Sequence, residues 1–575
     1  MNRHRLTHGA GFFVHIFLPQ AHILLLLTSY LLLLIRFLLY FFPDMCYNGR
    51  RILLNNGTKG LKIMRKSGIL MHISSLPGSY GIGRMGKEAY QFVDFLVKSK
   101  QSCWQILPVS PTSYGDSPYQ SFSVHAGNPY FIDPESLEKD GLLEPEDYKD
   151  IDWGGDLSAV DYGNIYENAF KVLRRAHKRF RKKPAKGYAK FAIENKGWLY
   201  EYGLFMALKE AHGGKAWYEW EEPLRLCKGK AVKAAAKKYA DDIDFWCFVQ
   251  FEYFKQWKRL KKYANVKGVR IIGDIPIYCA YDSVEVWAHP EYFYLDKDKK
   301  PIEVAGCPPD VFSEDGQLWG NPLYRWDYMA KEKYRWWIER IAAAFRIYDT
   351  VRIDHFRGFE SYYCIPYGAK TARKGQWRKG PDMKLFKEVN KRLGQVDIIA
   401  EDLGFLTKKV VKMLEASGYP GMKILEFAFD GDTANGYLPH NYKSSNSICY
   451  TGTHDNETVA GWAANADKKT VAFCKKYLGV RKDSDIPWAM VKLCWSSVAD
   501  TAVAQLQDIL GLDNTARMNT PSTVGENWRW RLTSMDILDD ELSQKLADLT
   551  ELYNRVPAKR DKTNEIPDEP DGTIK

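Results

Sequence analysis

The feature that most constrains the fold is a set of eight short apolar runs, separated by longer amphipathic stretches, from residue 64 onward. The runs cover residues 68–73, 102–109, 269–278, 350–356, 396–404, 421–429, 447–455 and 501–510. Apolar runs that alternate with helical patterns are typical of parallel strands connected by helices. Several runs end in a polar or charged residue, at the strand edge that carries the catalytic groups of a (β/α)8 TIM barrel. The sequence therefore predicts an α/β fold built on such a barrel.

Two stretches are too long to be simple connections between strands. About 160 residues separate the second run from the third, and they contain several helical patterns. Because one crossover helix needs far fewer residues, we expect 134–267 to form an inserted, mainly α-helical subdomain. The barrel is then expected to start at 64–133, with its first two strands, and to continue through 268–557, with a long active-site loop at 278–323. Residues 558–575 are expected to form a polar tail.

Residues 1–63 differ from the rest of the chain. They include AHILLLLTSYLLLLIRFLLYFF, which is apolar except for Arg36 and small polar groups and is long enough to cross a bilayer. One hypothesis is therefore a membrane anchor. We favour another, in which translation begins at Met64, because codons for Lys59 and Gly60 can spell a ribosome-binding sequence. The protein is then cytoplasmic, and a membrane is a partner only if residues 1–63 are truly translated.

Charge and cysteine usage argue against several classes of protein. The formal net charge is +11, but basic residues are scattered among acids, and 228–244 has the pattern of a solvated helix face. Nucleic acid is therefore not an expected partner. The ten cysteines form no CxxC and no cluster with histidine, which predicts isolated thiols in a reducing compartment and no metal site. Aromatic residues make up 14% of the chain, which suits either a large core or a cleft for flat ligands such as sugars.

Three predicted strand ends carry acids, namely Asp354, Glu401 and Asp455. Glycosidic cleavage needs one carboxylate at the anomeric carbon and one carboxylic acid that protonates the leaving oxygen. Arg352 lies two residues before Asp354, on the same face of the strand, and a nearby cation keeps a carboxylate ionised. A single acid at a strand end is most often a cap or an ion-pair partner, so spacing alone leaves a structural role open.

Longer segments resemble the amylomaltase family of 4-α-glucanotransferases, which is related to the α-amylase barrels. The motifs around the acids, RID at 352–354, AEDLG at 400–404 and GTHDN at 452–456, are similar in both groups. Four longer segments resemble amylomaltases specifically: GDSPYQSFSVHAGNPYFID (115–133), GDIPIYCAYDSVEVWAHPEYF (273–293), CPPDVFSEDGQLWGNPLYRW (307–326) and RMNTPSTVGENWRWR (517–531). The resemblance covers about residues 64–531.

The resemblance implies that Asp354 is the nucleophile, Glu401 the acid/base and Asp455 the carboxylate that stabilises the transition state. The implied substrate-binding residues are Arg352, His454, Tyr119, Asp274, Trp319, Asp310 and Gln317, with Tyr119 under the sugar and Trp319 over the acceptor side. The implied reaction is a retaining double displacement from an α-1,4-glucan donor to a glucan or glucose acceptor, without metal or organic cofactor. The Asp354 and Glu401 carboxyl groups are then expected roughly 5 to 5.5 Å apart.

One residue departs from the family pattern, and other functions remain possible at this point. Ser522 stands where this family is expected to have glycine, in a turn expected to be remote from the three acids. The alternative enzyme is an α-amylase-like retaining hydrolase that uses the same acids. A non-catalytic glucan-binding protein would lack one of the acids, and a membrane-anchored structural protein depends on residues 1–63 alone.

Overall fold

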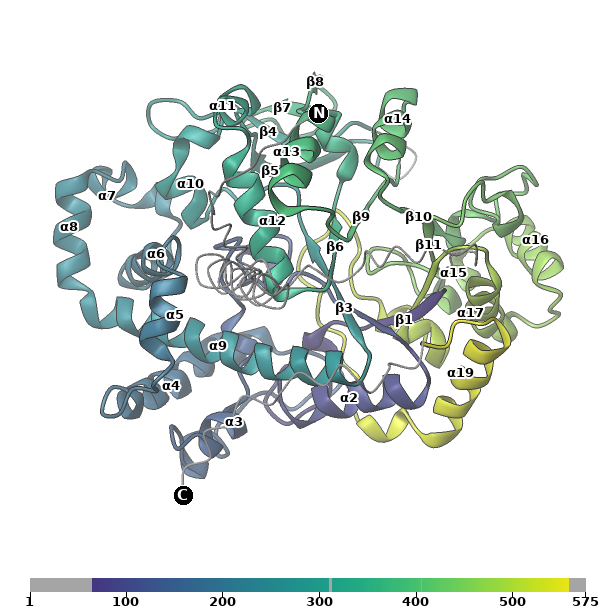
Figure 1. Cartoon of the computed structure of the whole chain (residues 1–575), viewed down its shortest axis with the longest axis horizontal. Coiled ribbons are helices and arrows are strands. Elements are labelled where there is room, and N and C mark those ends of the chain that lie inside the picture. Colours follow the sequence, from purple (N-terminus) through teal and green to yellow (C-terminus); the bar gives the residue numbers. More distant parts are fainter. Residues whose placement is uncertain (1–64, 310–312, 405, 558–575) are drawn as a thin grey trace, which may run out of the picture. The chain divides into compact units, whose positions relative to one another are not determined.

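The computed structural model describes residues 65–557 except 310–312 and 405, and its centre is a parallel eight-stranded sheet (Figure 1). The strands run in the order β10-β11-β12-β1-β2-β3-β6-β9. Their bounds are β1 (Lys66–Leu70), β2 (Cys103–Gln105), β3 (Arg270–Ile275), β6 (Thr350–Ile353), β9 (Ile398–Ala400), β10 (Gly421–Ile424), β11 (Ser447–Tyr450) and β12 (Thr501–Gln505). The two ends of this order meet, because the Ala400 N–H donates to the Pro420 carbonyl at 3.0 Å. The predicted (β/α)8 barrel is confirmed.

The predicted amino-terminal extension, 1–63, and the polar tail, 558–575, lie outside the described residues. Among the residues that are described, no helix is long and apolar enough to cross a membrane. The division of the remaining chain into the start of the barrel (64–133), a helical subdomain (134–267) and the rest of the barrel (268–557) stays a proposal.

Each of the eight apolar runs overlaps a barrel strand, but the strands are shorter than the runs, and the last run changes to a helix. Residues 501–510 form β12 only as far as Gln505 and continue as the helix α18 (Leu506–Leu510). Leu506 and Ile509, three residues apart, are both buried in this helix. Because the strand and the helix are both buried, the hydrophobicity of the run does not show where the strand ends and the helix begins.

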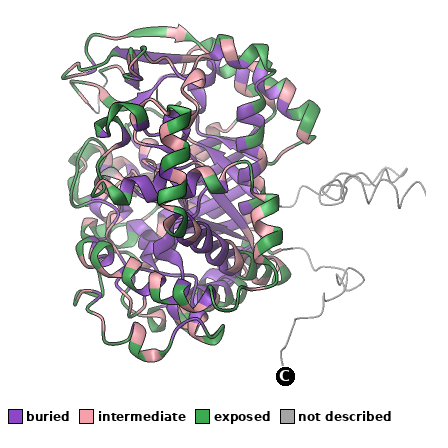
Figure 2. Cartoon of the chain, turned by 90° about the vertical axis from the view of Figure 1, so that its left-hand side faces the viewer, coloured by how far each residue is buried: buried purple, intermediate pink, exposed green. Residues whose placement is uncertain are grey.

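Helices surround the barrel and bury one face each, so that exposed residues lie mainly on the outside of the molecule (Figure 2). In α2 (Lys87–Lys98), for example, Phe92 and Leu96 lie one turn apart and are fully buried, whereas Lys87 is exposed. Besides α18 and the short α10 (Val284–Ala288), the helices after β3 are α11 (Trp326–Lys331), α12 (Arg335–Ile347), α13 (Met383–Leu393), α14 (Lys408–Ser417), α15 (Val459–Asn465), α16 (Lys468–Leu478), α17 (Ile486–Ser496) and α19 (Asp540–Leu552).

The regular structure between β2 and β3 is helical in the described residues. Its helices are α3 (Pro134–Lys139), α4 (Tyr162–Phe180), α5 (Tyr188–Glu194), α6 (Leu199–Ala211), α7 (Glu222–Arg225), α8 (Gly229–Lys238) and α9 (Ala240–Val266). Aromatic side chains join them, and the rings of Phe180 in α4 and Phe248 in α9 lie 4.8 Å apart. In α8 only Ala235 is buried, which agrees with the predicted solvated face.

A second sheet, which the sequence did not predict, combines two strands of the expected long loop with two strands that follow β6. It is antiparallel, in the order β5-β4-β7-β8, and consists of β4 (Glu303–Cys307), β5 (Gln317–Pro322), β7 (Ser361–Pro366) and β8 (Gln376–Lys379). Val304, Tyr363, Ile365 and Ala372 form its small core. The segment 278–323 therefore contains two strands and the helix α10 (Val284–Ala288), and it is not simply a loop.

Arg555, which follows α19, connects this end of the chain to the first barrel strand through hydrogen bonds. Its guanidinium is fully buried and donates to the carbonyls of Trp495 at 2.7 Å, Lys66 at 2.8 Å, and Ser497 and Ala499 at 3.0 Å. An Arg555→Met variant fills a similar volume but removes these hydrogen bonds. Arg65 still donates to the Trp495 and Ser497 carbonyls, and each buried acceptor that is left unsatisfied costs about 1–3 kcal/mol. We expect the free energy of unfolding to fall by about 3 kcal/mol, measured as a lower urea midpoint.

The control for this variant is Arg181→Met, because the Arg181 side chain is half exposed in its ion pair with Asp241. The control should change the free energy of unfolding by less than about 0.5 kcal/mol. An Arg555→Met midpoint equal to that of the control contradicts the role given to Arg555.

Candidate active site

The three predicted acids lie at or just beyond the carboxyl ends of three barrel strands. Asp354 directly follows β6, Glu401 directly follows β9, and Asp455 lies five residues beyond β11. β6 and β9 are neighbours, with Ile353 opposite Ala400, so that Asp354 and Glu401 leave adjacent strands at the same level. The barrel therefore brings acids from distant parts of the sequence to one edge.

The chain turns sharply after Asp354, and this turn holds Glu401. His355 has φ 51°, in the left-handed region, which ends the strand immediately after the acid. Its backbone N–H donates to Glu401 Oε2 at 2.7 Å, and the Leu403 N–H donates to Oε1 at 2.6 Å. Two backbone donors thus fix the position of the Glu401 carboxyl group beside Asp354.

Arg352 is the buried cation of the site, with 3% of its side chain exposed. Its Nη1 lies 3.1 Å from Asp354 Oδ1 and 2.5 Å from Asp274 Oδ2. The Tyr119 hydroxyl also donates to Asp274 Oδ2, at 2.9 Å. Asp274 is almost fully buried, and its Oδ1 has no hydrogen-bond partner within the described part of the chain. Here Asp274 orients Arg352 and Tyr119.

The two acids share a buried environment that also contains the charge of Arg352. Burial raises the pKa of Asp354 and the pKa of Glu401, because a carboxylate loses hydration when it is buried. The Arg352 guanidinium opposes this shift, while the charge of Glu401 raises the pKa of Asp354 further. Two acids so close titrate as a pair. The short guanidinium contact favours the negative charge on Asp354, and the N–H groups of His355 and Leu403 lower the pKa of Glu401 against the effect of burial.

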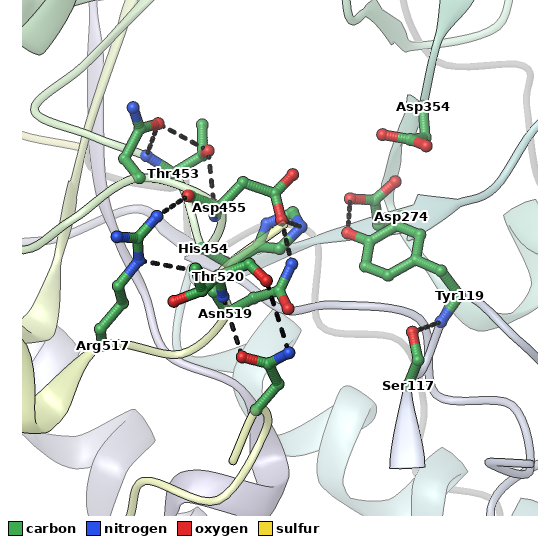
Figure 3. A network of polar contacts seen from close by, with 12 residues as sticks. Ser117, Tyr119, Asp274, Asp354, Thr453, His454, Asp455, Arg517, Asn519 and Thr520 are labelled. Atoms are coloured by element: carbon green, nitrogen blue, oxygen red, sulfur yellow. Dashed lines mark hydrogen bonds and ion pairs between the residues drawn. The ribbon is translucent and has the colours of Figure 1, made fainter. Parts of the chain in front are cut away.

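Asp455 is held by residues for which the sequence predicted no role (Figure 3). Asn519 Nδ2 donates to Asp455 Oδ1 at 2.6 Å, and Arg517 Nη2 donates to the Asp455 backbone carbonyl at 2.8 Å. Arg517 Nε also donates to the Asn519 carbonyl at 2.8 Å, which connects the two. In the sequence, Arg517 and Asn519 were singled out only as part of the segment 517–531. That segment resembles amylomaltases specifically, but no function was predicted for these two residues.

Aromatic rings line the same part of the site. The Tyr119 ring stacks on the His454 imidazole, with centroids 5.1 Å apart and planes 13° apart. Trp528 packs against both, with centroid distances of 5.9 and 5.8 Å. Burial lowers the pKa of His454, so its imidazole is neutral at pH 7, and its Nε2 lies 3.4 Å from Asp455 Oδ1. The structure thus places predicted residues Tyr119 and His454 side by side.

The second sheet carries Trp319, which was predicted to cover the acceptor side, and Gln317, which was predicted to reach the glucan. Trp319 lies on β5, and its ring meets the His355 imidazole edge to face, with centroids 4.8 Å apart. Trp319 Nε1 donates to Gln317 Oε1 at 3.0 Å. The structure therefore brings Trp319 and Gln317 close to Asp354 through His355. Asp310, the last predicted binding residue, lies outside the described residues.

Ser522 has φ 67°, in the left-handed region that favours glycine and costs a residue with Cβ about 1 kcal/mol. Asn527 closes this turn, because its Oδ1 accepts from the Thr520 N–H at 2.9 Å. Asn519, which contacts Asp455, directly precedes Thr520. The departure from the expected glycine therefore lies in a segment connected to an acid of the site, although the sequence placed it remote from the acids.

Comparison with known proteins identifies the family. A family model described as 4-alpha-glucanotransferase matches residues 71–537. The chain belongs to the 4-alpha-glucanotransferase family. The glucanotransferase is 48% identical to the 4-alpha-glucanotransferase of Clostridium butyricum over 487 residues, which cover 84% of this chain and 100% of that relative. It is 44% identical to that of Thermus thermophilus over 506 residues, which cover 86% of this chain and 100% of that relative.

Solved structures agree with this family. An amylomaltase from Streptococcus agalactiae in complex with acarbose superposes on the glucanotransferase with a TM-score of 0.83, at 43% sequence identity, over 86% of this chain and 100% of that chain. An amylomaltase from Corynebacterium glutamicum, at 18% identity, has the same fold with a TM-score of 0.67, over 86% of this chain and 75% of that one. The activity is therefore that of a 4-α-glucanotransferase, and the α-amylase-like hydrolase is not favoured.

Proposed function

We propose that this glucanotransferase moves a segment of an α-1,4-glucan to the 4-hydroxyl of another glucan or of glucose by a retaining double displacement. Asp354 is the nucleophile, Glu401 the acid/base and Asp455 the carboxylate that stabilises the transition state. The observation that carries this assignment is the 3.1 Å contact of Arg352 with Asp354, while Glu401, on the neighbouring strand, is held by backbone N–H groups. The Arg352 contact favours the ionised form of Asp354, and burial, which raises the pKa of Glu401, favours the protonated form of the acid/base.

In the first step Asp354 attacks the anomeric carbon while Glu401 gives its proton to the leaving oxygen, so that a β-linked glycosyl-enzyme forms. In the second step Glu401 takes the proton of the acceptor hydroxyl, which attacks the same carbon and restores the α configuration. Asp455, fixed by Asn519, lies where it can bind sugar hydroxyls as positive charge develops. The expected separation of the Asp354 and Glu401 carboxyl groups, roughly 5 to 5.5 Å, stays a prediction.

The remaining predicted residues are proposed to hold the sugars. The stacked rings of Tyr119 and His454 are proposed to contact the donor sugar. Asp274 is proposed to support this contact, because it accepts a hydrogen bond from Tyr119 and pairs with Arg352. Trp319, Gln317 and Asp310 are proposed to bind the acceptor side. Transfer exceeds hydrolysis when a bound acceptor is better positioned than water, which a covering aromatic residue favours.

We also propose that the protein acts in the cytoplasm without a cofactor, on sugars alone. The cysteines of the described residues are free thiols, which suits a reducing compartment. No nucleic acid is proposed as a partner.

Incubation with pure maltotriose tests the proposed transfer directly. A transferase is expected to convert maltotriose into glucose and a ladder of longer maltooligosaccharides, with almost no rise in the total number of reducing ends. Products are separated by anion-exchange chromatography while reducing ends are counted in parallel. Steady release of reducing ends without longer chains would mean hydrolysis and would overturn the proposal.

The pH dependence should reveal the proton on Glu401. Burial raises the pKa of Glu401 above its ordinary value of 4.5, so the acid form is present below that raised pKa and is lost as the pH rises through it. We expect kcat/KM on maltotriose to fall on the alkaline side. The same limb should be absent for α-maltosyl fluoride, because fluoride leaves without a proton. Identical alkaline limbs for both substrates contradict the assignment of Glu401.

A further inference from the structure

Three tyrosines from separate segments meet at the surface, away from the acids. Tyr218 lies in the short helical turn Trp217–Glu219, Tyr281 lies between β3 and α10, and Tyr367 directly follows β7. The rings of Tyr218 and Tyr281 stack with centroids 4.6 Å apart and planes 7° apart. Tyr367 meets Tyr281 at 6.3 Å and 73°. We call these three residues the tyrosine platform.

The tyrosine platform exposes ring surface to solvent. Tyr218 is 42% exposed and Tyr367 is 49% exposed, whereas Tyr281 lies partly buried between them. Single exposed aromatic residues are common on protein surfaces, whereas clusters of exposed rings are a feature of ligand-binding and protein-binding surfaces. Burial and the nearby carboxylates of Asp282 and Glu219 raise the pKa of Tyr218, so its phenol stays neutral and can donate a hydrogen bond.

Buried contacts hold the tyrosine platform in place before any ligand arrives. Trp217, which is fully buried, packs its ring against Tyr281 at 5.2 Å and donates from Nε1 to the Tyr281 carbonyl at 2.7 Å. The Tyr281 hydroxyl donates to the Lys299 carbonyl at 2.9 Å. A surface that is already ordered loses little conformational entropy on binding, which favours recognition of a flexible ligand.

The tyrosine platform is connected to the catalytic cleft. Tyr281 comes three residues after Tyr278, whose ring lies 6.3 Å from that of Trp319. Three residues span at most about 11 Å between Cα atoms, so the backbone of Tyr281 lies close to that of Tyr278. Trp319 in turn contacts His355, the neighbour of Asp354. The buried Tyr278 therefore connects Tyr281 of the tyrosine platform with Trp319 at the cleft.

We infer that the tyrosine platform is a second binding surface for α-1,4-glucan, which holds a distal part of a long chain while another part occupies the cleft. Flat rings stack on the apolar faces of sugar rings, and the phenol and carboxylate groups around them suit sugar hydroxyls. The inference rests on glucan being the substrate, as proposed above. Beyond the proposed function, it assigns the binding of long glucan chains to residues outside the catalytic cleft.

The test is the double variant Tyr218→Ala, Tyr367→Ala in the full chain. We expect its KM for amylose to rise about tenfold, since two stacking contacts are lost. Its kinetics on maltotriose, which is too short to reach the platform from the cleft, should stay within about twofold. Retardation of the protein in amylose-containing gels should weaken in parallel, and this readout needs no turnover, so it remains valid even if transfer on maltotriose fails.

Two controls separate ring stacking from general damage. Tyr200→Ala removes a tyrosine that is 54% exposed on α6, outside the platform, and should leave amylose binding unchanged. The double variant Tyr218→Phe, Tyr367→Phe keeps the rings and should keep most of the binding. An unchanged KM for amylose in the alanine variant overturns the inference, as does an equal loss on maltotriose. A changed sedimentation state with unchanged amylose binding also overturns it and identifies a protein interface instead.

Discussion

The Asp354→Asn variant is expected to lose transfer and hydrolysis together, by about 10⁴-fold or more in kcat/KM on maltotriose. The amide has nearly the same shape as the carboxylate but carries no charge and cannot form the glycosyl-enzyme. It also loses the ion pair with Arg352, whose Nη1 now lies 3.1 Å from Asp354. A loss of this size corresponds to about 5.4 kcal/mol of transition-state stabilisation.

Asp402→Asn is the matched control for this variant. Asp402 follows Glu401 at the same strand end, and its Oδ1 accepts from the Met422 N–H at 2.7 Å, a bond that the asparagine oxygen can keep. We expect the control to retain activity within about tenfold of the unchanged enzyme. Comparable losses in both variants would mean that any change of charge at this edge is harmful, and Asp354 would lose its special role.

The Glu401→Gln variant is expected to depend on the leaving group of its substrate. On maltotriose, whose leaving oxygen needs a proton, kcat/KM should fall by about 10³-fold. On α-maltosyl fluoride the first step should stay within about tenfold, because fluoride departs without general acid catalysis. The second step lacks its base in this variant, so the glycosyl-enzyme should accumulate and turnover should stay low.

Azide provides the control for Glu401→Gln, since it is a nucleophile that needs no general base. With α-maltosyl fluoride, added azide should restore turnover of Glu401→Gln and yield an α-glycosyl azide, whereas it should do nothing for Asp354→Asn. Full activity of Glu401→Gln on maltotriose would refute the assignment of the acid.

The barrel could be predicted because each of its strands is encoded locally. Strands such as β12 are buried along their whole length, and such strands appear in the sequence as short apolar runs. The second sheet could not be predicted in the same way. Its strand β4 pairs with β7, more than fifty residues further along and beyond β6, and no local pattern identifies so distant a partner.

The same distinction applies to the site. Asp354 and Glu401 could be predicted because each directly follows a strand, where the barrel alone determines their position. Asn519 could not, because its 2.6 Å contact with Asp455 joins two segments that come together only in the folded protein. His355 was missed as a positioning residue because its role depends on φ 51° and on its backbone N–H, which residue types do not reveal.

Peptide mapping of the trapped intermediate tests the central claim most directly. The Glu401→Gln protein is mixed with α-maltosyl fluoride, digested, and analysed by mass spectrometry for a covalently bound maltosyl group. We expect this group on Asp354, bound as an ester to the carboxylate that Arg352 contacts. A maltosyl group on Asp274 or Asp455, or release of fluoride with no covalent adduct on any residue, would contradict that claim.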